Sequence, residues 1–456
     1  MCAKNRFISR DAALGGFFPN PNRDTGAQKS RGRASKFRLP AYSVEYRYRA
    51  RTASARSFHS ILANNNTGRV ASKFSYSLML AFTVLFSGWI SFLLNLLFAP
   101  SVQINLSLSE ACFSTSQTLN GLAECLEDFT VLKGTYNRFT YLEAQPTVTQ
   151  RDAWFKATYT LLYTDNNCTT SILPSAIQDI YAIDLFTDIS GKSFCVLYER
   201  TVNPCSKLYE KGWGFAMVPA SRAGVSRLIH ISAPHPFFDG ETTVEAAQIF
   251  SETGAKSLLV PGRMRNAFYA PSPCVQPTGS KSSMYYITDP AHNDQEPFFD
   301  ANLAVWDWQN QQGGCPSSSC AFIQFHGKAE KTCSEDTIFL STGLSRGSWY
   351  TDGVDRPIKR LQQKLVHAFH LANAPGKISL PSHSRCILTA TKNVIGRYIN
   401  NYPTSSTQYD VCHRSASPDI TEGAFVHAEQ NAFARSDKAR GAWVRALNNT
   451  FASINV

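Results

Sequence analysis

Three short motifs that would each assign a chemistry are missing from the 456 residues of this chain. No two cysteines have the CxxC spacing of a zinc ribbon, and no HExxH sequence offers two zinc-binding histidines one helical turn apart. The Asp-x-Asp tripeptide that glycosyltransferases using metal-bound nucleotide sugars commonly need is also absent. A zinc ribbon and a Golgi glycosyltransferase are therefore disfavoured, and any metal site has to be assembled from residues far apart in the chain.

One stretch of the chain contains no charged residue, and the stretch before it carries a large excess of positive charge. Residues 76–99 contain no charged side chain, and 24 residues at about 1.5 Å each can cross a hydrocarbon core of about 30 Å. Residues 1–75 carry 15 Lys and Arg against only Asp11, Asp24 and Glu45. Because the basic excess lies in a tail of low periodicity, we expect a disordered cytosolic segment before a type II membrane anchor, and no nucleic-acid binding.

Cysteines and glycosylation patterns cluster beyond the predicted anchor. Eleven of the twelve cysteines, all except Cys2, follow it, as do acceptor patterns at Asn105, Asn167 and Asn448. This distribution predicts an oxidising compartment and several disulfides, with one odd thiol that is free or pairs between chains. The Arg- and Ser-rich tail also fits a mitochondrial presequence, so the secretory pathway is the preferred location and the mitochondrion the alternative.

The part of the chain beyond the predicted anchor divides into two stretches that differ in the pattern of their apolar residues. Residues 101–220 bear cysteines and short apolar runs at 159–163, 180–186 and 194–198, which predict strands in a preceding layer or subdomain. Residues 221–456 alternate strand and helix patterns. Strands are predicted at 228–231, 257–260, 321–325, 337–340 and 424–428, and helices at 242–253, 298–309, 357–371 and 437–451. We expect an α/β fold with a mostly parallel mixed sheet and helices on both faces.

Several of these strands end in side chains that can bind a metal. His235 follows the 228–231 strand and is succeeded by Asp239 and Glu241, while His326 ends the 321–325 strand. Sites in open α/β sheets form at the carboxyl ends of strands, and zinc in hydrolases takes two nitrogens and one carboxylate while keeping a fourth position for water. We expect His235, His326 and either Asp239 or Glu241 to bind zinc, with Asp239 preferred. Glu429, on a late strand, is the predicted general base.

These residues, in this order, resemble the zinc-dependent amidohydrolases related to carboxypeptidases, of the N-formylglutamate amidohydrolase and phage poly-γ-glutamate hydrolase type. The matching motifs are His235 with Asp239 and Thr242, the strand end Phe325-His326-Gly327, and the strand FVHAEQ, which contains Glu429. The resemblance implies a carboxypeptidase-like fold, a zinc ion and a Glu general base acting on an amide bond.

The resemblance covers about residues 225–450 and extends to substrate contacts. It implies that Arg397 and Asn400, in GRYIN, hold a substrate carboxylate, and that His292 is a metal ligand or a substrate contact. Arg265 and His427 are further predicted substrate-binding residues, and the substrate is a small molecule or a peptide-like compound. The alternative hypothesis is a catalytically inactive type II receptor or attachment ectodomain that binds zinc weakly or not at all.

Overall fold

The computed structural model describes residues 107–278, 284–374, 376–401 and 410–454. The described residues belong to the second of two units into which the chain divides, residues 104–456. Among them, none of the helices combines the length and the apolar character that a membrane crossing requires. The predicted tail at 1–75 and the predicted anchor at 76–99 lie outside the described residues and stay predictions.

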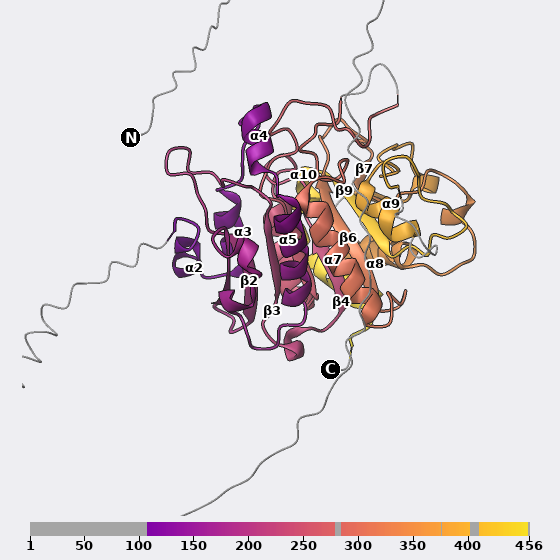
Figure 1. Cartoon of the computed structure of the whole chain (residues 1–456). Helices are drawn as coiled ribbons and strands as arrows, with labels where there is room; N and C mark the ends of the chain where they lie inside the picture. Colours follow the sequence, from indigo (N-terminus) through magenta and orange to yellow (C-terminus); the bar gives the residue numbers. More distant parts are fainter. Residues whose placement is uncertain (1–106, 279–283, 375, 402–409, 455–456) are drawn as a thin grey trace, which may run out of the picture. The chain divides into compact units, whose positions relative to one another are not determined.

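A nine-stranded sheet forms the centre of the second unit (Figure 1). In spatial order its strands are β1 (Tyr181–Thr187), β2 (Ser193–Glu199), β3 (Phe215–Pro219), β5 (Ser257–Val260), β4 (Leu228–Ser232), β6 (Cys320–Gly327), β9 (Phe425–Gln430), β7 (Asp336–Ser341) and β8 (Lys377–Ser379). The four strands β5, β4, β6 and β9 are parallel, as the predicted strand–helix alternation requires. The α/β class is therefore confirmed.

The prediction of a mostly parallel sheet holds for this centre and for the edge pair β7 and β8, which is also parallel. The strands β1, β2 and β3 are joined to β5 by antiparallel pairing, and β7 runs antiparallel to β9. Antiparallel neighbours need only short connections, whereas parallel ones need a crossover of a dozen or more residues. The stretch 101–220, interpreted from the sequence as a preceding layer or subdomain, thus supplies three strands of the same sheet.

Helices cover both faces of the sheet. One group comprises α3 (Leu119–Glu127), α6 (Thr242–Thr253), α8 (Pro357–Leu371) and α11 (Asp437–Thr450). The other comprises α5 (Val148–Leu161), α7 (Pro297–Gln311) and α9 (Val394–Asn401). Three short helices, α2 (Ala111–Thr115), α4 (Arg138–Ala144) and α10 (Ala432–Arg435), complete the helices described here.

Alternation along β6 brings two polar side chains to the α7–α9 face. Ile323 and Phe325 belong to the hydrophobic core on the α6–α11 face, and Phe322 to the core on the opposite face. Successive side chains of a strand point to opposite faces, so Gln324 and His326 share the face of Phe322. The strand therefore changes from apolar to polar on this face as it approaches its carboxyl end.

One predicted strand is a helix end. Tyr159–Tyr163 includes the last turn of α5, which begins with a capping box between Thr147 and Gln150. Trp154 and Leu161, seven residues apart, are buried and give the helix its core-facing side. Tyr159 and Tyr163 made the segment resemble a strand, although they lie on the exposed side of the helical turn. Their hydroxyls are 3.1 Å apart there.

Five disulfides confirm the prediction that this part of the chain is cross-linked. They join Cys112 to Cys125, Cys168 to Cys195, Cys274 to Cys412, Cys315 to Cys320, and Cys333 to Cys386. No cysteine in the described ranges is free, so the expected free thiol is not found there.

Candidate metal centre

The predicted site residues lie where the parallel strands end. His235 follows β4 in the chain, and His326 lies near the end of the neighbouring strand β6. Glu429 is the register partner of His326 on the next strand, β9, so the two side chains point to the same face. The carboxyl ends of three adjacent strands thus bring together residues that are almost two hundred positions apart.

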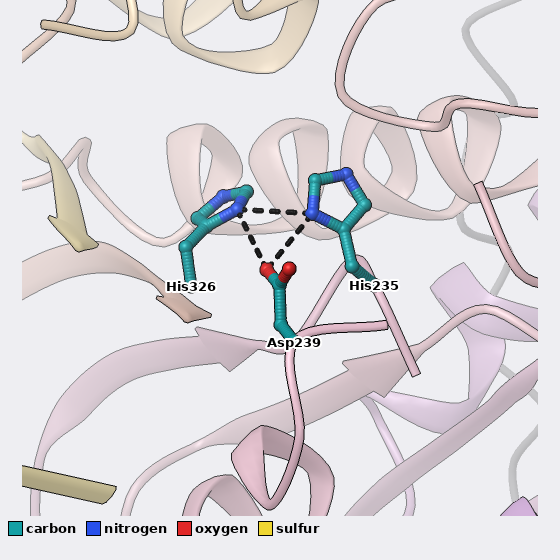
Figure 2. Close-up of side chains that lie close together, drawn as sticks. All are labelled: His235, Asp239 and His326. Atoms are coloured by element: carbon teal, nitrogen blue, oxygen red, sulfur yellow. Dashed lines mark hydrogen bonds and ion pairs between the residues drawn. The ribbon is translucent and has the colours of Figure 1, made fainter. Parts of the chain in front are cut away.

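Three ligand atoms form a compact triangle at this edge (Figure 2). Asp239 Oδ2 lies 2.9 Å from His235 Nδ1 and 3.3 Å from His326 Nδ1, and the two Nδ1 atoms are 3.2 Å apart. A tetrahedral zinc ion with bonds of about 2.0–2.1 Å separates its ligand atoms by about 3.3–3.4 Å. The donor set therefore fits a divalent metal with only slight movement of the side chains.

The outer nitrogen of His235 binds a carboxylate that the sequence analysis did not identify. His235 Nε2 donates to Asp289 Oδ1 at 3.1 Å, and the backbone N–H of Ala291 donates to the same oxygen. Asp289 Oδ2 is ion-paired with Arg265 and lies 3.0 Å from His292 Nδ1. A hydrogen bond from one ring nitrogen leaves the other available to a metal, so Asp289 directs Nδ1 of His235 into the triangle.

The second imidazole is oriented by an amide. His326 Nε2 donates to Gln324 Oε1 at 3.1 Å, and Asn393 Nδ2 donates to the same oxygen at 2.6 Å. Asn393 precedes α9, and its Oδ1 accepts the backbone N–H of Gly396. Each histidine therefore has a fixed outer hydrogen bond, as metal-ligating histidines usually do.

A tight turn explains how an acid four residues after His235 reaches the same point. The backbone N–H of Asp239 donates to the carbonyl of His235 at 3.0 Å, which folds the chain back over the imidazole. Glu241 instead has a side chain that is 63% exposed and ion-paired with Arg440. Of the two acids left open by the sequence, the structure brings Asp239 to the histidines.

The electrostatics favour the metal-binding protonation states of Asp239 and His326, but not that of His235. Burial alone would raise the pKa of Asp239, but His235 and His326 outweigh it and hold that pKa well below its usual range. Burial lowers the pKa of His326 to about 4 in spite of its contact with Asp239. An anionic carboxylate and a neutral imidazole are the forms that bind a metal. For His235, burial and Arg265 act against protonation, but Asp239 and Asp289 raise its pKa.

Glu429 and His427 form the side of the cluster next to β9. Burial, followed by the charge of Asp239, raises the pKa of Glu429 to about 8. His427 Nε2 lies 3.6 Å from Glu429 Oε1, and the ring of His427 lies 4.3 Å from that of His326. Burial, followed by the neighbouring His326, holds the pKa of His427 well below its ordinary value. A neutral imidazole therefore lies between a metal ligand and the predicted base.

The predicted metal ligands are more deeply buried than three of the residues around them. The side chains of His235, Asp239 and His326 are at most 4% exposed, whereas those of Glu429, His292 and Arg265 are 13%, 14% and 20% exposed. Tyr285 stacks on His292 with ring centroids 3.6 Å apart. The more exposed residues are those predicted to contact substrate or to act as the base.

Arg397 and Asn400 are not brought into the triangle. Arg397 Nε donates to the carbonyl of Thr391 at 2.8 Å, and its Nη1 to that of Val411 at 2.7 Å. Asn400 Nδ2 donates to the carbonyl of Thr342. Arg397 Nη2 also donates to the hydroxyl of Ser415 at 3.4 Å. These contacts hold loops in place, and a role of either residue in binding a substrate carboxylate stays a prediction.

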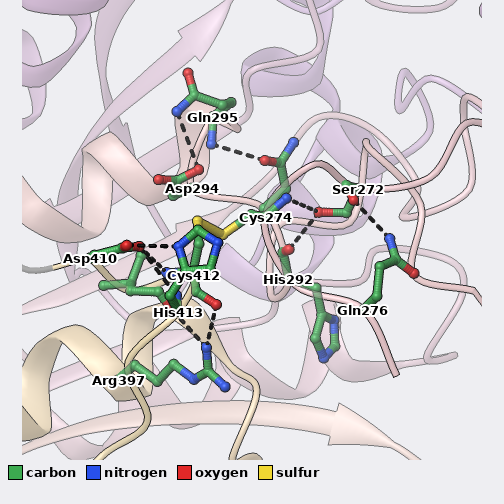
Figure 3. Close-up of a disulfide and its surroundings, with 12 residues drawn as sticks. Ser272, Cys274, Gln276, His292, Asp294, Gln295, Arg397, Asp410, Cys412 and His413 are labelled. Atoms are coloured by element: carbon green, nitrogen blue, oxygen red, sulfur yellow. Dashed lines mark hydrogen bonds and ion pairs between the residues drawn. A yellow bond between two sulfur atoms is a disulfide. The ribbon is translucent and has the colours of Figure 1, made fainter. Parts of the chain in front are cut away.

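A second group of potential ligands is excluded by its chemistry. Cys274, Asp294 and Cys412 lie close together, but the two sulfur atoms are bonded to each other (Figure 3). A disulfide offers no thiolate to a metal. Figure 3 also shows the guanidinium of Arg397 directed at the segment that carries Cys412, where Nη1 donates to its carbonyl at 3.0 Å.

The sequence analysis missed three residues that hold the outer nitrogens of the two histidines, directly or through one other residue: Asp289, Gln324 and Asn393. Gln324 carried a signal, since it is a polar residue two positions before His326 in the apolar strand AFIQFHG and must share its face. Asp289 and Asn393 carried none, because each lies in a loop whose path the sequence does not reveal.

Comparison with known proteins assigns no family. No protein-family model matches the chain, and no curated protein does. Two solved structures are similar, from proteins provisionally described as metallopeptidases of Shewanella baltica OS155 and Shewanella denitrificans OS217. Each is 10% identical with a TM-score of 0.20; each match covers 66% of this chain, and 89% and 87% of the respective neighbours. At that TM-score the likeness carries no argument about fold or chemistry.

Proposed function

We propose that the protein is a zinc-dependent hydrolase that cleaves amide bonds. The observation that supports it best is the triangle of two Nδ1 atoms and one carboxylate oxygen, with edges of 2.9, 3.2 and 3.3 Å. Two nitrogens and a carboxylate with a remaining open position are typical of catalytic zinc. The outer hydrogen bonds of both histidines support the same assignment, since they are the usual second layer of a metal site.

The reaction would divide its tasks between the metal and Glu429. Zinc, when bound, supplies Lewis-acid chemistry that polarises an amide carbonyl and acidifies water. The carboxylate of Glu429 accepts the proton of the attacking water and delivers it to the leaving nitrogen as the C–N bond breaks. Its raised pKa of about 8 suits a group that must both take and return a proton near neutral pH.

The substrate we propose is a small or peptide-like amide with a nearby carboxylate. Arg265 is the cation best placed to attract it, because its charge acts on both Asp239 and Glu429 and its side chain is 20% exposed. His292, which is 3.0 Å from Asp289, and His427, which is 3.6 Å from Glu429, are proposed as further substrate contacts. We also propose a type II membrane protein of the secretory pathway, on the evidence of residues 76–99 and the disulfides.

Metal analysis of the purified full-length chain tests this function. We expect about one equivalent of zinc per chain, as a three-residue donor set of this kind binds one ion. Glu429→Gln should keep the zinc and abolish hydrolysis of N-acyl amino acids, whereas the exposed Glu422→Gln should change neither. A wild-type chain that takes up no zinc when zinc is supplied would instead favour the inactive ectodomain.

A further inference from the structure

The turn that carries Asp239 has an unusual backbone. Phe237 has φ 57° and Gly240 has φ 69°, both in the left-handed region. A bulky residue such as Phe is rarely found there, and such a conformation persists only when its surroundings hold it. The position of the Asp239 carboxylate therefore depends on contacts from outside the turn.

Arg435 supplies one of these contacts. It is the last residue of α10, six positions after Glu429, and its Nη1 donates to the backbone carbonyl of Asp239. The hydrogen bond is made to the main chain of a predicted metal ligand, not to its carboxylate. It links the turn after β4 to the segment that follows β9.

Two glycines leave the space in which this guanidinium lies. A Cβ added at Gly327 would overlap Arg435 Nη1 and would also collide with the Asp239 carbonyl oxygen. A Cβ at Gly240 would lie 3.3 Å from the same Nη1. A residue without a side chain is therefore needed at position 327 because of the space that Arg435 occupies. The backbone conformation of the strand does not require a glycine there.

Glu127 holds the turn from another element. Its Oε1 accepts the backbone N–H of Phe237 and the hydroxyl of Thr243, each at 2.8 Å. Glu127 is the last residue of α3 and is 5% exposed. The turn is therefore fixed through Phe237 by a carboxylate and through Asp239 by a guanidinium.

We propose that Arg435 is a positioning residue for the metal ligand Asp239, acting through that residue's carbonyl oxygen. This inference rests on the proposed metal site. Holding the carbonyl fixes the direction in which the carboxylate meets His235 and His326. Residues that support metal ligands from behind typically alter metal affinity by about 10–100-fold when they are changed.

Zinc affinity of full-length variants, measured by competition with a chelator, tests the proposal. Arg435→Met should bind zinc about 10–100-fold more weakly, and Arg435→Lys should recover part of the loss because it keeps one donor. Arg227→Met is the matched control, since Arg227 donates to three main-chain carbonyls, those of Phe451, Thr253 and Asn448, and precedes the amino end of β4, whereas the ligands lie beyond the carboxyl ends of the strands. We expect it to lower the unfolding temperature of the metal-free protein without changing zinc affinity.

A second variant crowds the same contact from β6. A Cβ at Gly327 would collide with both Arg435 Nη1 and the Asp239 carbonyl oxygen, so Gly327→Ala should weaken zinc binding at least as much as Arg435→Met does. With cobalt in place of zinc, both should show the same altered visible absorption, which a general loss of stability would not produce.

The outcomes separate the two proposals. A wild-type chain that binds no zinc overturns the metal site itself. A wild-type chain that binds zinc, with Arg435→Met and Gly327→Ala binding it within about twofold of wild type, overturns the positioning role alone.

Discussion

Asp289 accepts a hydrogen bond from Nε2 of His235 at 3.1 Å, on the side of the ring opposite to the metal-binding nitrogen. The carboxylate is fully buried and kept anionic. Burial alone would raise the pKa of Asp289, but Arg265, followed by His292 and His235, holds it well below the usual range. An anionic acceptor both fixes the tautomer of His235 and increases the electron density available to a metal.

The first prediction concerns this carboxylate. Asp289→Asn keeps the shape of the side chain but removes its charge, so we expect zinc affinity to fall about 10–100-fold. The measurement is chelator competition on the full-length protein. Asp294→Asn, in the same loop but paired with Gln295, is the control and should bind zinc as wild type does. Unchanged affinity in Asp289→Asn would show that the hydrogen bond does not support the metal.

The second prediction concerns the amide behind His326. Gln324→Leu leaves Nε2 of His326 and Nδ2 of Asn393 without the acceptor that they share. We expect a loss of about 1–3 kcal/mol in the free energy of unfolding, because both donors are buried. Zinc affinity should fall about tenfold as the ring loses its orientation. Gln324→Glu keeps the acceptor and should restore the affinity; equal affinity in the leucine variant would contradict the assignment.

The triangle could be predicted from the sequence because it follows from strand ends. His235 and His326 come at the ends of apolar runs that are adjacent parallel strands, so their meeting needs only the topology of the sheet. The choice between Asp239 and Glu241 depends on the turn after His235. The spacing of four residues between His235 and Asp239 does not by itself determine that turn. Asp289 and Asn393 were missed because loops, unlike strands, carry no period that fixes the direction of a side chain.

Arg397 shows the same limit for a side chain whose role stays a prediction. An arginine near an asparagine resembles a carboxylate clamp, yet the five N–H donors of a guanidinium can equally be used by oxygen atoms of the protein. Here Arg397 donates to the carbonyls of Thr391, Val411 and Cys412 and to the hydroxyl of Ser415, contacts that no local sequence pattern indicates. For a similar reason, the strands β1–β3 could not be predicted as part of the main sheet. The local pattern of apolar residues predicts a strand but does not show which strand it pairs with.

The third prediction concerns pH and stability. Glu245, on α6, is completely buried, and burial raises its pKa to about 8, although Gln430 donates a hydrogen bond to it. The folded protein therefore keeps a proton that the unfolded chain loses above about pH 4.5, so this residue makes stability fall as pH rises from about 4.5 to about 8. Glu245→Gln should remove that part of the fall.

Urea unfolding at several pH values checks this prediction. At about pH 9 the glutamine variant should be more stable than wild type by about 1–3 kcal/mol, and near pH 4 the difference should vanish or reverse. Other buried acids titrate in the same range, so the difference between variant and wild type is the informative quantity. Glu252→Gln, at an exposed position of the same helix, should leave the pH dependence unchanged. Parallel curves for wild type and Glu245→Gln would refute the assignment.

The fourth prediction concerns the disulfide between Cys274 and Cys412, which joins positions 138 residues apart. A cross-link that closes a long loop restricts the unfolded chain more than one that closes a short loop. We expect replacement of both cysteines by alanine to cost about 2–5 kcal/mol, measured as a lower thermal unfolding midpoint. Replacing the pair Cys315 and Cys320, only five residues apart, is the control and should cost less.

Because Arg397 binds the carbonyls of Val411 and Cys412, the loop should stay near its native place, and zinc affinity should be retained. A larger loss from the short-range pair would show that strain or packing, rather than loop closure, decides the contribution of these cross-links.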